Sequence, residues 1–375
     1  MAINDHWYRP ESGPAWLSPA SWLYERAQLA DRRRKLKEQL ENKEKLNCLR
    51  ESGAKPPFVI AVGNVNVGGT GKTPATLWLV EYLKRMGHQP AILTRGYGVK
   101  RAKDSVLSLQ RHTDKSKGEF DPAIYGDEPV LLHERSKELV VIANSRMLGL
   151  LEIIKKAPEV NVVVCDDALQ HYQLPRHYEL AVVDAGLGFG NGQLLPKGPL
   201  RENPARLQHC DNVLINGAAT LADVPDNVKR DLERFVPREK WLMSTVTGQV
   251  FKHILSGEEV DLVSMKEFAT NNNVLAMAGM AHPHKFFNTL AELGIATNAQ
   301  LGFSDHAAYG ENDFRRPEFS CADYILCTEK DAEKCRAYAD ERWFYLPVEL
   351  LVEEKSAQRF HQQIAYKLES FQLEP

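Results

Sequence analysis

The chain has 375 residues, of which 43% are hydrophobic, and 47 Lys and Arg stand against 50 Asp and Glu, for a net charge of −3. This composition is typical of a folded globular protein and excludes a largely disordered chain, a collagen-like fibre and a small disulfide scaffold. The slight negative charge argues against a general nucleic-acid-binding protein. The six cysteines form no CxxC pair, so a zinc ribbon is not expected. No stretch reaches the roughly 18 apolar residues of a membrane-spanning helix.

Residues 1–50 combine aromatic and basic side chains and form an expected N-terminal segment. Residues 21–50 carry nine Lys or Arg against five Asp or Glu. Such a mixture is typical of helices that lie on anionic membranes. The alternative is a solvated helix whose aromatic residues pack on the protein's own core. The basic residues Arg26 and Arg33 make the amphipathic pattern imperfect. Helical spacing nevertheless places four apolar residues on one side: Trp22, Leu29, Leu36 and Leu40.

Residues 51–220 alternate short apolar runs with helical stretches. This pattern predicts a layered α/β fold with a parallel sheet of the kind found in P-loop NTPases. Residues 221–375 repeat the alternation and predict a second, smaller α/β lobe. We expect the first sheet to contain strands at 58–62, 91–94, 139–143, 160–165, 180–184 and 213–216.

The clearest motif is GNVNVGGTGKTP at residues 63–74, between an expected strand and an apolar helix. In this context, loop amides and a helix N-terminus surround the phosphates of a nucleotide. Lys72 is expected to reach the terminal phosphates, and the Thr73 hydroxyl to bind Mg²⁺. The residues expected to bind the nucleotide are Asn66, Val67, Gly68, Gly69, Thr70, Gly71, Lys72 and Thr73.

Acidic residues suited to phosphoryl transfer follow at two places. The apolar run 160–165 ends in Asp166 and Asp167, one of which is expected to hold Mg²⁺ and the other to face the substrate. Which carboxylate does which remains open from sequence. Asp127, in the motif GDEP, is either a helix cap or the base for an attacking hydroxyl.

Two basic candidates complete the set. Arg95 follows the expected strand 91–94 in the motif RGYG, so it either faces a ligand phosphate or belongs to a surface turn. His306, in the segment FSDHAAY, either hydrogen-bonds an acid such as Asp127 or has a structural role.

These motifs together resemble one family, the tetraacyldisaccharide 4'-kinases (lipid A 4'-kinases) of Gram-negative bacteria. The ordered set is specific and covers most of the chain. The motifs are GGTGKTP, RGYG, GDEP, DDALQH, LLPKGPLRE, AGMAHPHKFF, FSDHAAY and TEKDAEK.

The resemblance implies transfer of the γ-phosphate of ATP, with Mg²⁺, to the 4'-hydroxyl of tetraacyldisaccharide 1-phosphate in lipid A biosynthesis. It implies a site between two lobes in which Asp127 and His306 activate the hydroxyl and Lys72 holds the phosphates. It also implies a peripheral enzyme, here expected as a monomer, on the cytoplasmic face of the inner membrane. The further ligand shell would comprise Thr73, Asp166 and Glu128 at the metal, and Arg95, Asp167, Gln170 and Asn64 at the substrate.

Two rival functions remain open from the residues. A P-loop kinase for a small soluble molecule, or a nucleotide-hydrolysing switch, would use the same loop without needing the aromatic and basic N-terminus. A membrane adaptor that merely retains a nucleotide site is disfavoured, because Lys72, Thr73, Asp127, Asp166 and Asp167 are all present.

Overall fold

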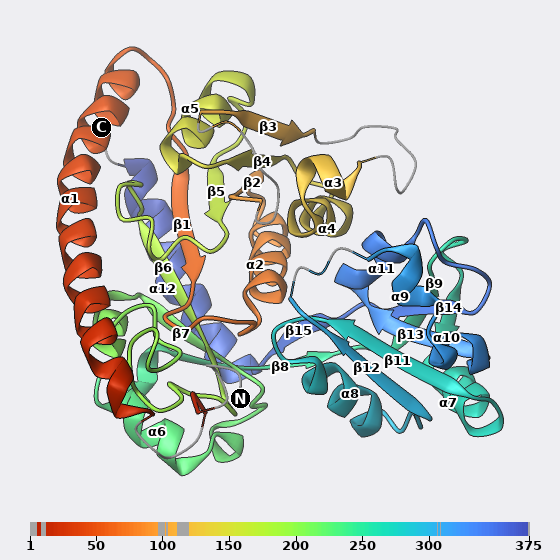
Figure 1. Cartoon of the computed structure of the whole chain (residues 1–375). Helices are drawn as coiled ribbons and strands as arrows, with labels where there is room; N and C mark the ends of the chain where they lie inside the picture. Colours follow the sequence, from red (N-terminus) through yellow and green to blue (C-terminus); the bar gives the residue numbers. More distant parts are fainter. Residues whose placement is uncertain are drawn as a thin grey trace.

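The computed structural model describes residues 6–8, 13–96, 102, 104–110, 120–305, 307 and 309–373. It has two α/β lobes, each built on one sheet, and a long N-terminal helix (Figure 1). The expected fold class is therefore confirmed.

The first sheet has nine strands, and its centre is parallel. The strand β1 lies between β5 and β6 and runs parallel to both. Two strands are antiparallel to their neighbours, β3 beside β4 and β15 beside β8. In spatial order the strands are β15 (Glu349–Val352), β8 (Trp241–Thr247), β7 (Asn212–Asn216), β6 (Tyr178–Asp184), β1 (Phe58–Gly63), β5 (Val162–Cys165), β2 (Pro90–Thr94), β4 (Val140–Ala143) and β3 (Val106–Leu109).

Helices cover both faces of this sheet, which explains its near-continuous apolar strands. Alternate residues of β1 point to opposite faces of the sheet and contact different helices. Phe58, Ile60 and Val62 pack with α2 (Lys72–Arg85), α4 (Asp127–Ser136) and α12 (Glu354–Leu373). Val59 and Ala61 pack with α5 (Arg146–Lys156) on the other face. The β6–β8 side of that second face is covered by η2 (Pro204–His209) and α6 (Asp226–Glu233).

The second sheet has six strands between two layers of helices. Its middle strands β12, β11, β13 and β14 are parallel, and β9 and β10 add an antiparallel edge. In spatial order the strands are β10 (Glu259–Asp261), β9 (Val250–His253), β14 (Trp343–Leu346), β13 (Tyr324–Thr328), β11 (Val274–Gly279) and β12 (Ala299–Phe303). The lobe's helices are α7 (Leu262–Asn271), α8 (Pro283–Glu292), α9 (Glu311–Phe314), α10 (Pro317–Cys321) and α11 (Glu329–Cys335).

The two sheets divide the chain differently from the boundary expected at residue 220. The strand β8 joins the first sheet, and the chain returns to that sheet through β15 and α12 after completing the second. The second sheet is therefore formed by residues 250–346, a segment inserted into the first lobe. The expected surface loop at 110–122 falls largely outside the described residues, and α3 (Pro122–Tyr125) follows it.

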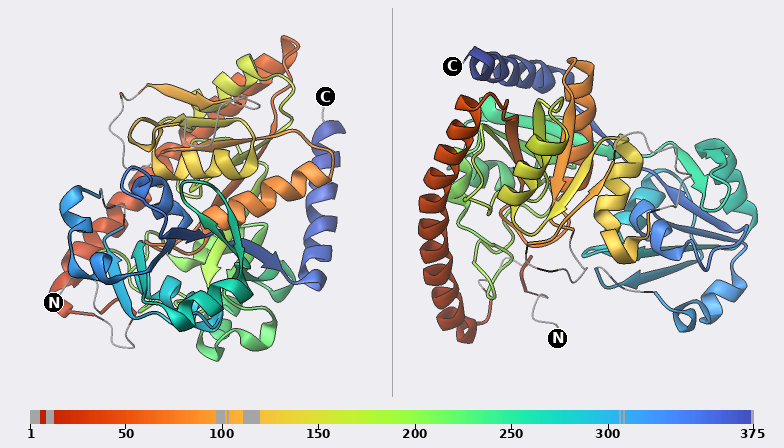
Figure 2. Two further views of the ribbon diagram at one scale, coloured as in Figure 1. Left: turned by 90° about the vertical axis from the view of Figure 1, so that its right-hand side faces the viewer. Right: turned by 90° about the horizontal axis from the view of Figure 1, so that it is seen from above.

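The helix α1 (Ser18–Glu51) runs along the flank of the first lobe that faces away from the second lobe (Figures 1 and 2). Its inward side is mostly polar, and side chains there donate hydrogen bonds to backbone carbonyl groups of the core. The four apolar residues that helical spacing groups together are exposed, and of these Leu36 lies at the edge of the side that faces the core. Among the described residues, no helix is long and apolar enough to cross a membrane. The inward donors and acceptors are Ser21 to Leu194, Tyr24 to Arg201, Lys35 to Gln170, Gln39 to Leu174 and Asn42 to Gln173.

Candidate active site

The P-loop connects β1 to α2 at the carboxyl end of the first sheet. Its shape depends on Gly71, which has a φ of 95°, a conformation that favours glycine. A Cβ at this position would lie 2.3 Å from Nδ2 of Asn216. That amide is needed in place, because it donates to the carbonyl of Thr70 over 3.1 Å. Asn64 fixes the loop from within by donating to the Thr70 hydroxyl over 2.8 Å.

The polar groups at the start of the P-loop are hydrogen-bonded within the protein, whereas the backbone amides at its end have no partner in the described part of the chain. The amide of Val67 donates to the carbonyl of Pro199 over 2.8 Å, and the side chain of Asn66 donates to Gly188 over 3.0 Å. Both residues therefore brace the loop against residues 188–199. Among the residues that the structure describes, the amides from 68 to 73 donate to no other group. These amides form the part of the loop that can receive phosphate oxygens.

Lys72 lies at the start of α2, close to the expected acidic pair. Its Nζ is 3.4 Å from Oδ1 of Asn64 and 3.7 Å from Oδ1 of Asp167. Arg201 also pairs with Asp167, at 3.1 Å. Burial alone would raise the pKa of Asp167, but Lys72 and Arg201 outweigh burial and hold that pKa well below its usual range. Asp167 is therefore a permanent carboxylate beside the P-loop lysine.

Asp166 lies in a different environment, although it is adjacent in sequence. Its side chain is buried, and Oδ1 accepts a hydrogen bond of 3.0 Å from Thr76, one turn into α2. Burial raises the pKa of Asp166 to about 6, and the charges of Glu128 and Asp167 act in the same direction. The carboxylate of Asp166 thus lies where a cation would relieve an uncompensated negative charge.

Thr73, Asp166 and Glu128 fit a Mg²⁺ site by their chemistry. All three offer oxygen donors, and Glu128 is close enough to Asp166 to raise its pKa. Among the described residues, no group of three or more His, Cys, Asp or Glu could hold a metal on its own. In kinases, Mg²⁺ binds through one or two protein carboxylates, and substrate phosphates and water complete its coordination shell.

Asp127 begins α4 and faces the second lobe. Its side chain is 7% exposed, and its Oδ2 lies 3.0 Å from Nζ of Lys334 and 3.6 Å from Nζ of Lys330. Lys330 is also 3.3 Å from both Glu128 and Asp305. These three carboxylates raise the pKa of Lys330, although burial opposes them. The acids of the GDEP motif therefore meet two lysines of α11 across the boundary between the lobes.

The other predicted site residues lie around this centre or outside the described residues. His306 falls outside them, and so do residues 97 and 98 of the RGYG motif. Arg95 directly follows β2 and is exposed. Gln170 donates from Nε2 to the carbonyl of Asn64 over 2.9 Å, so it supports the entry to the P-loop.

The second lobe also approaches the P-loop through the segment between β11 and α8. A Cβ on Gly68 would lie 3.5 Å from Nε2 of His282. Lys285 of α8 also forms an ion pair across the lobes with Asp184, at the end of β6. The P-loop and the acidic pair thus lie at the edge where the two lobes meet.

The sequence motifs assign no role to four residues that the structure places at this site: Thr76, Arg201, Lys330 and Lys334. Arg201 belongs to the motif LLPKGPLRE, and the two lysines belong to TEKDAEK. The motifs themselves were the available signal for these three. Thr76 had no signal beyond its position one helical turn after Thr73.

A P-loop on a parallel sheet, with paired carboxylates at the end of the neighbouring strand, defines a nucleotide-binding protein of the P-loop NTPase class. Comparison with known proteins is more specific. Residues 14–368 match the family described as tetraacyldisaccharide-1-P 4'-kinase. A tetraacyldisaccharide 4'-kinase of Methylobacillus flagellatus is 35% identical over 360 residues, which are 95% of this chain and 94% of the relative.

A similar solved structure supports the same family. The crystal structure of LpxK from Aquifex aeolicus in complex with ATP has a TM-score of 0.67 and 25% identity, over 94% of this chain and 99% of that one. The chain therefore belongs to the tetraacyldisaccharide-1-P 4'-kinase family. It is a kinase that transfers phosphate to a hydroxyl group of a lipid A precursor.

Proposed function

We propose that this site transfers the γ-phosphoryl group of ATP to the 4'-hydroxyl of tetraacyldisaccharide 1-phosphate, with Mg²⁺ bound between protein and nucleotide. One observation carries the assignment of roles. Lys72, the pair Asp166 and Asp167, and the GDEP acids converge where the carboxyl end of the first sheet meets the second lobe. The ATP complex of the Aquifex aeolicus relative supports ATP as the donor.

The P-loop holds the triphosphate in this proposal. The amides from 68 to 73 and Nζ of Lys72 neutralise and position the β- and γ-phosphates, which is most of what phosphoryl transfer requires. Thr73, Asp166 and Glu128 would hold Mg²⁺, which shields charge on the transferring group. Asp167 orients Lys72 and faces the acceptor, with Arg95, Gln170 and Asn64 around it.

Asp127 acts as the base that accepts the proton of the sugar hydroxyl. The backbone amide of Glu128 donates to its Oδ1 over 3.0 Å, which leaves Oδ2 directed toward the second lobe. His306, which directly follows Asp305 in the chain, orients this carboxylate. Lys330 and Lys334 keep the crowded acids of both lobes together until the nucleotide and the metal bind.

The helix α1 brings the enzyme to its substrate. The helix exposes Trp22, Leu29, Leu36 and Leu40, and basic residues lie beside them. Aromatic and aliphatic groups in the headgroup region, together with cationic side chains, favour an anionic membrane surface. The proposed location is the cytoplasmic face of the bacterial inner membrane, where the acyl chains of the substrate remain in the bilayer.

A transfer assay with γ-labelled ATP, Mg²⁺ and tetraacyldisaccharide 1-phosphate in mixed micelles tests these roles. Lys72→Ala and Asp127→Asn should each lower the rate of label transfer at least about a hundredfold, because each removes a group that stabilises or deprotonates in the transition state. The exposed Lys355 provides the matched control, and Lys355→Ala should keep the wild-type rate.

Each role can fail separately in this assay. Wild-type transfer by either folded variant would overturn the role of that residue. Release of label only as free phosphate, whether or not the lipid is present, would indicate a nucleotide-hydrolysing switch in place of a lipid kinase.

A further inference from the structure

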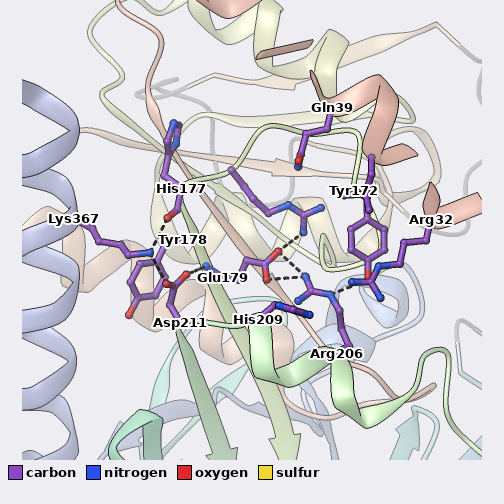
Figure 3. Close-up of a pocket in the computed structure, with 12 residues that line it drawn as sticks. Arg32, Gln39, Tyr172, His177, Tyr178, Glu179, Arg206, His209, Asp211 and Lys367 are labelled. Atoms are coloured by element: carbon purple, nitrogen blue, oxygen red, sulfur yellow. Dashed lines mark hydrogen bonds and ion pairs between the residues drawn. The ribbon is translucent and has the colours of Figure 1, made fainter. Parts of the chain in front are cut away.

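A cavity of about 390 Å³ lies beneath α1, at the amino end of β6 and away from the P-loop (Figure 3). It is lined by residues of α1, of the loop that precedes β6, of η2 and of α12. None of these residues has a role in the kinase reaction described above. The inference below is therefore independent of that reaction.

Three arginines surround one aromatic ring at this cavity. The guanidinium carbons of Arg32, Arg176 and Arg206 lie 5.0, 5.3 and 5.2 Å from the ring centroid of Tyr172. Arg32 comes from α1 and Arg206 from η2, and both reach toward Tyr172 in Figure 3. Three separate parts of the chain thus bring like charges to one place.

Acidic residues neutralise only part of this charge. Arg176 and Arg206 share Glu179, at 3.0 and 2.6 Å. Glu202 accepts a hydrogen bond from the hydroxyl of Tyr172. Arg32 forms no ion pair with any of the residues that the structure describes. Lys367 and Asp211 also line the cavity, and they pair with each other. Around the ring of Tyr172, three guanidinium groups against the carboxylates of Glu179 and Glu202 leave one net positive charge.

Two of the arginines also have unused donors. The side chain of Arg176 is only 6% exposed, yet its Nη2 has no hydrogen-bond partner among the described residues. The buried Nε of Arg32 also lacks a hydrogen-bond partner among these residues. Native proteins rarely leave buried donors unsatisfied, and ordered water or an ion is a usual partner for such a group. Burial also lowers the pKa of Arg176, as expected where a buried charge lacks full compensation.

We propose that this cavity binds a phosphate group, held by the guanidinium groups of Arg32 and Arg176, with Arg206 beside them. Guanidinium forks match phosphate oxygens, and donors from three directions suit a tetrahedral anion better than a planar carboxylate. The group belongs either to inorganic phosphate or to the headgroup of an anionic phospholipid. Because Arg32 is part of α1, an occupied cavity would tie this helix to the core.

Calorimetric titration of the full chain tests the proposal, with a non-hydrolysable ATP analogue filling the P-loop. The probes are inorganic phosphate and, separately, dihexanoyl phosphatidylglycerol below its critical micelle concentration. Arg32→Gln should weaken binding about tenfold, because one charge-assisted donor is lost. Arg33→Gln is the matched control, since Arg33 is the adjacent, exposed residue of the same helix and carries the same charge.

The two probes separate the two sources of the phosphate group. If inorganic phosphate binds the wild-type chain and Arg33→Gln alike but binds Arg32→Gln about tenfold more weakly, the ligand is a free anion. If only the short-chain phosphatidylglycerol shows this difference between the variants, the ligand is a lipid headgroup. Equal weakening by both substitutions would mean general attraction to a basic helix and would overturn the proposal. Failure of the wild-type chain to bind either probe would overturn it as well.

Discussion

Asp166 and Asp167 are adjacent in sequence, yet the pKa values of their carboxyl groups move in opposite directions. Asp167 faces Lys72 and Arg201, and these charges outweigh burial. Asp166 is buried and accepts a side-chain hydrogen bond from Thr76, and burial raises its pKa to about 6. The positive φ of Asp167, 47°, marks the turn that sends the two side chains to different surroundings. This divergence suits one metal-binding and one substrate-facing carboxylate.

The raised pKa of Asp166 predicts that its ionised side chain lowers the free energy of unfolding at pH 7, although phosphoryl transfer requires it. A carboxyl group with a raised folded-state pKa stabilises the fold most below its usual pKa of 3.8, and this contribution is lost as the pH rises through about 6. At pH 7 without metal, Asp166→Asn should therefore raise the free energy of unfolding by about 1–3 kcal/mol while abolishing transfer. The gain should shrink at pH 4, where Asp166 is protonated. Urea unfolding at both pH values measures it.

Asp167→Asn is the control, because it should change the free energy of unfolding in the opposite direction. The pKa of Asp167 is lowered, so its contribution to stability is present above its usual pKa and is lost only as the pH falls through the folded-state value. Asp167→Asn should destabilise the protein at pH 7. If both substitutions destabilise equally at pH 7, the assignment of the two environments is wrong.

Local signals allowed some of these residues to be predicted from sequence. Asp166 directly follows the apolar strand β5, and Lys72 stands at the end of the glycine-rich loop that follows β1, which are the places that metal and phosphate binding require. Arg201 and Lys330 arrive from far along the chain, so no local spacing could place them beside Asp167 and Asp127. The role of His306 stays a prediction.

At the scale of elements, much of α1 reverses the usual arrangement of a surface helix. Polar residues such as Gln39 and Asn42 face the core and donate to backbone carbonyls, whereas Trp22 and Leu40 are exposed. Near the carboxyl end the usual arrangement returns, and Leu46 is buried against the core. Helical spacing in the sequence identified the apolar side correctly. It could not show which side faces the core, because that depends on carbonyl groups supplied by residues 170–201.

The reversed helix predicts that membrane affinity and stability can be separated. Trp22 is 55% exposed, so Trp22→Ser should leave the melting temperature unchanged. It should weaken binding to phosphatidylglycerol vesicles about tenfold or more, since a buried aromatic side chain contributes roughly 2 kcal/mol. Leu46, buried at the other end of α1, serves as the control. Leu46→Ala should lower the melting temperature and leave vesicle binding unchanged, and the reverse pattern would refute this orientation of α1.

At the scale of the whole molecule, the second sheet is an insertion whose limits the sequence did not reveal. The apolar run 241–246 was expected in the second lobe, but it pairs with β7 as β8 of the first sheet. The run has the same β-branched and apolar character in either place. Which sheet a strand joins depends on long-range partners such as β15, which returns about a hundred residues later to close the edge.

Because of this insertion, the lobes meet through a small number of charged contacts, and Lys330 is central to them. Its Nζ lies within 3.6 Å of Asp127, Glu128 and Asp305, which come from both lobes. Lys330→Gln would leave these carboxylates facing one another without that cation. Their repulsion should loosen the contact between α4 and α11, and the amide hydrogens of both helices should exchange about tenfold faster at low salt.

Salt distinguishes this repulsion from a simple packing defect. At about 1 M salt the Debye length falls to about 3 Å, so screening should restore much of the protection in Lys330→Gln. A packing defect would not recover. Lys355→Gln removes the same charge from an exposed position outside this contact and should exchange like the wild-type chain at both salt concentrations. Unchanged exchange in α4 and α11 of Lys330→Gln at low salt would show that Lys330 does not hold the lobes together, and that other ion pairs between the lobes, such as Lys334 with Asp127 and Arg135 with Glu329, are sufficient.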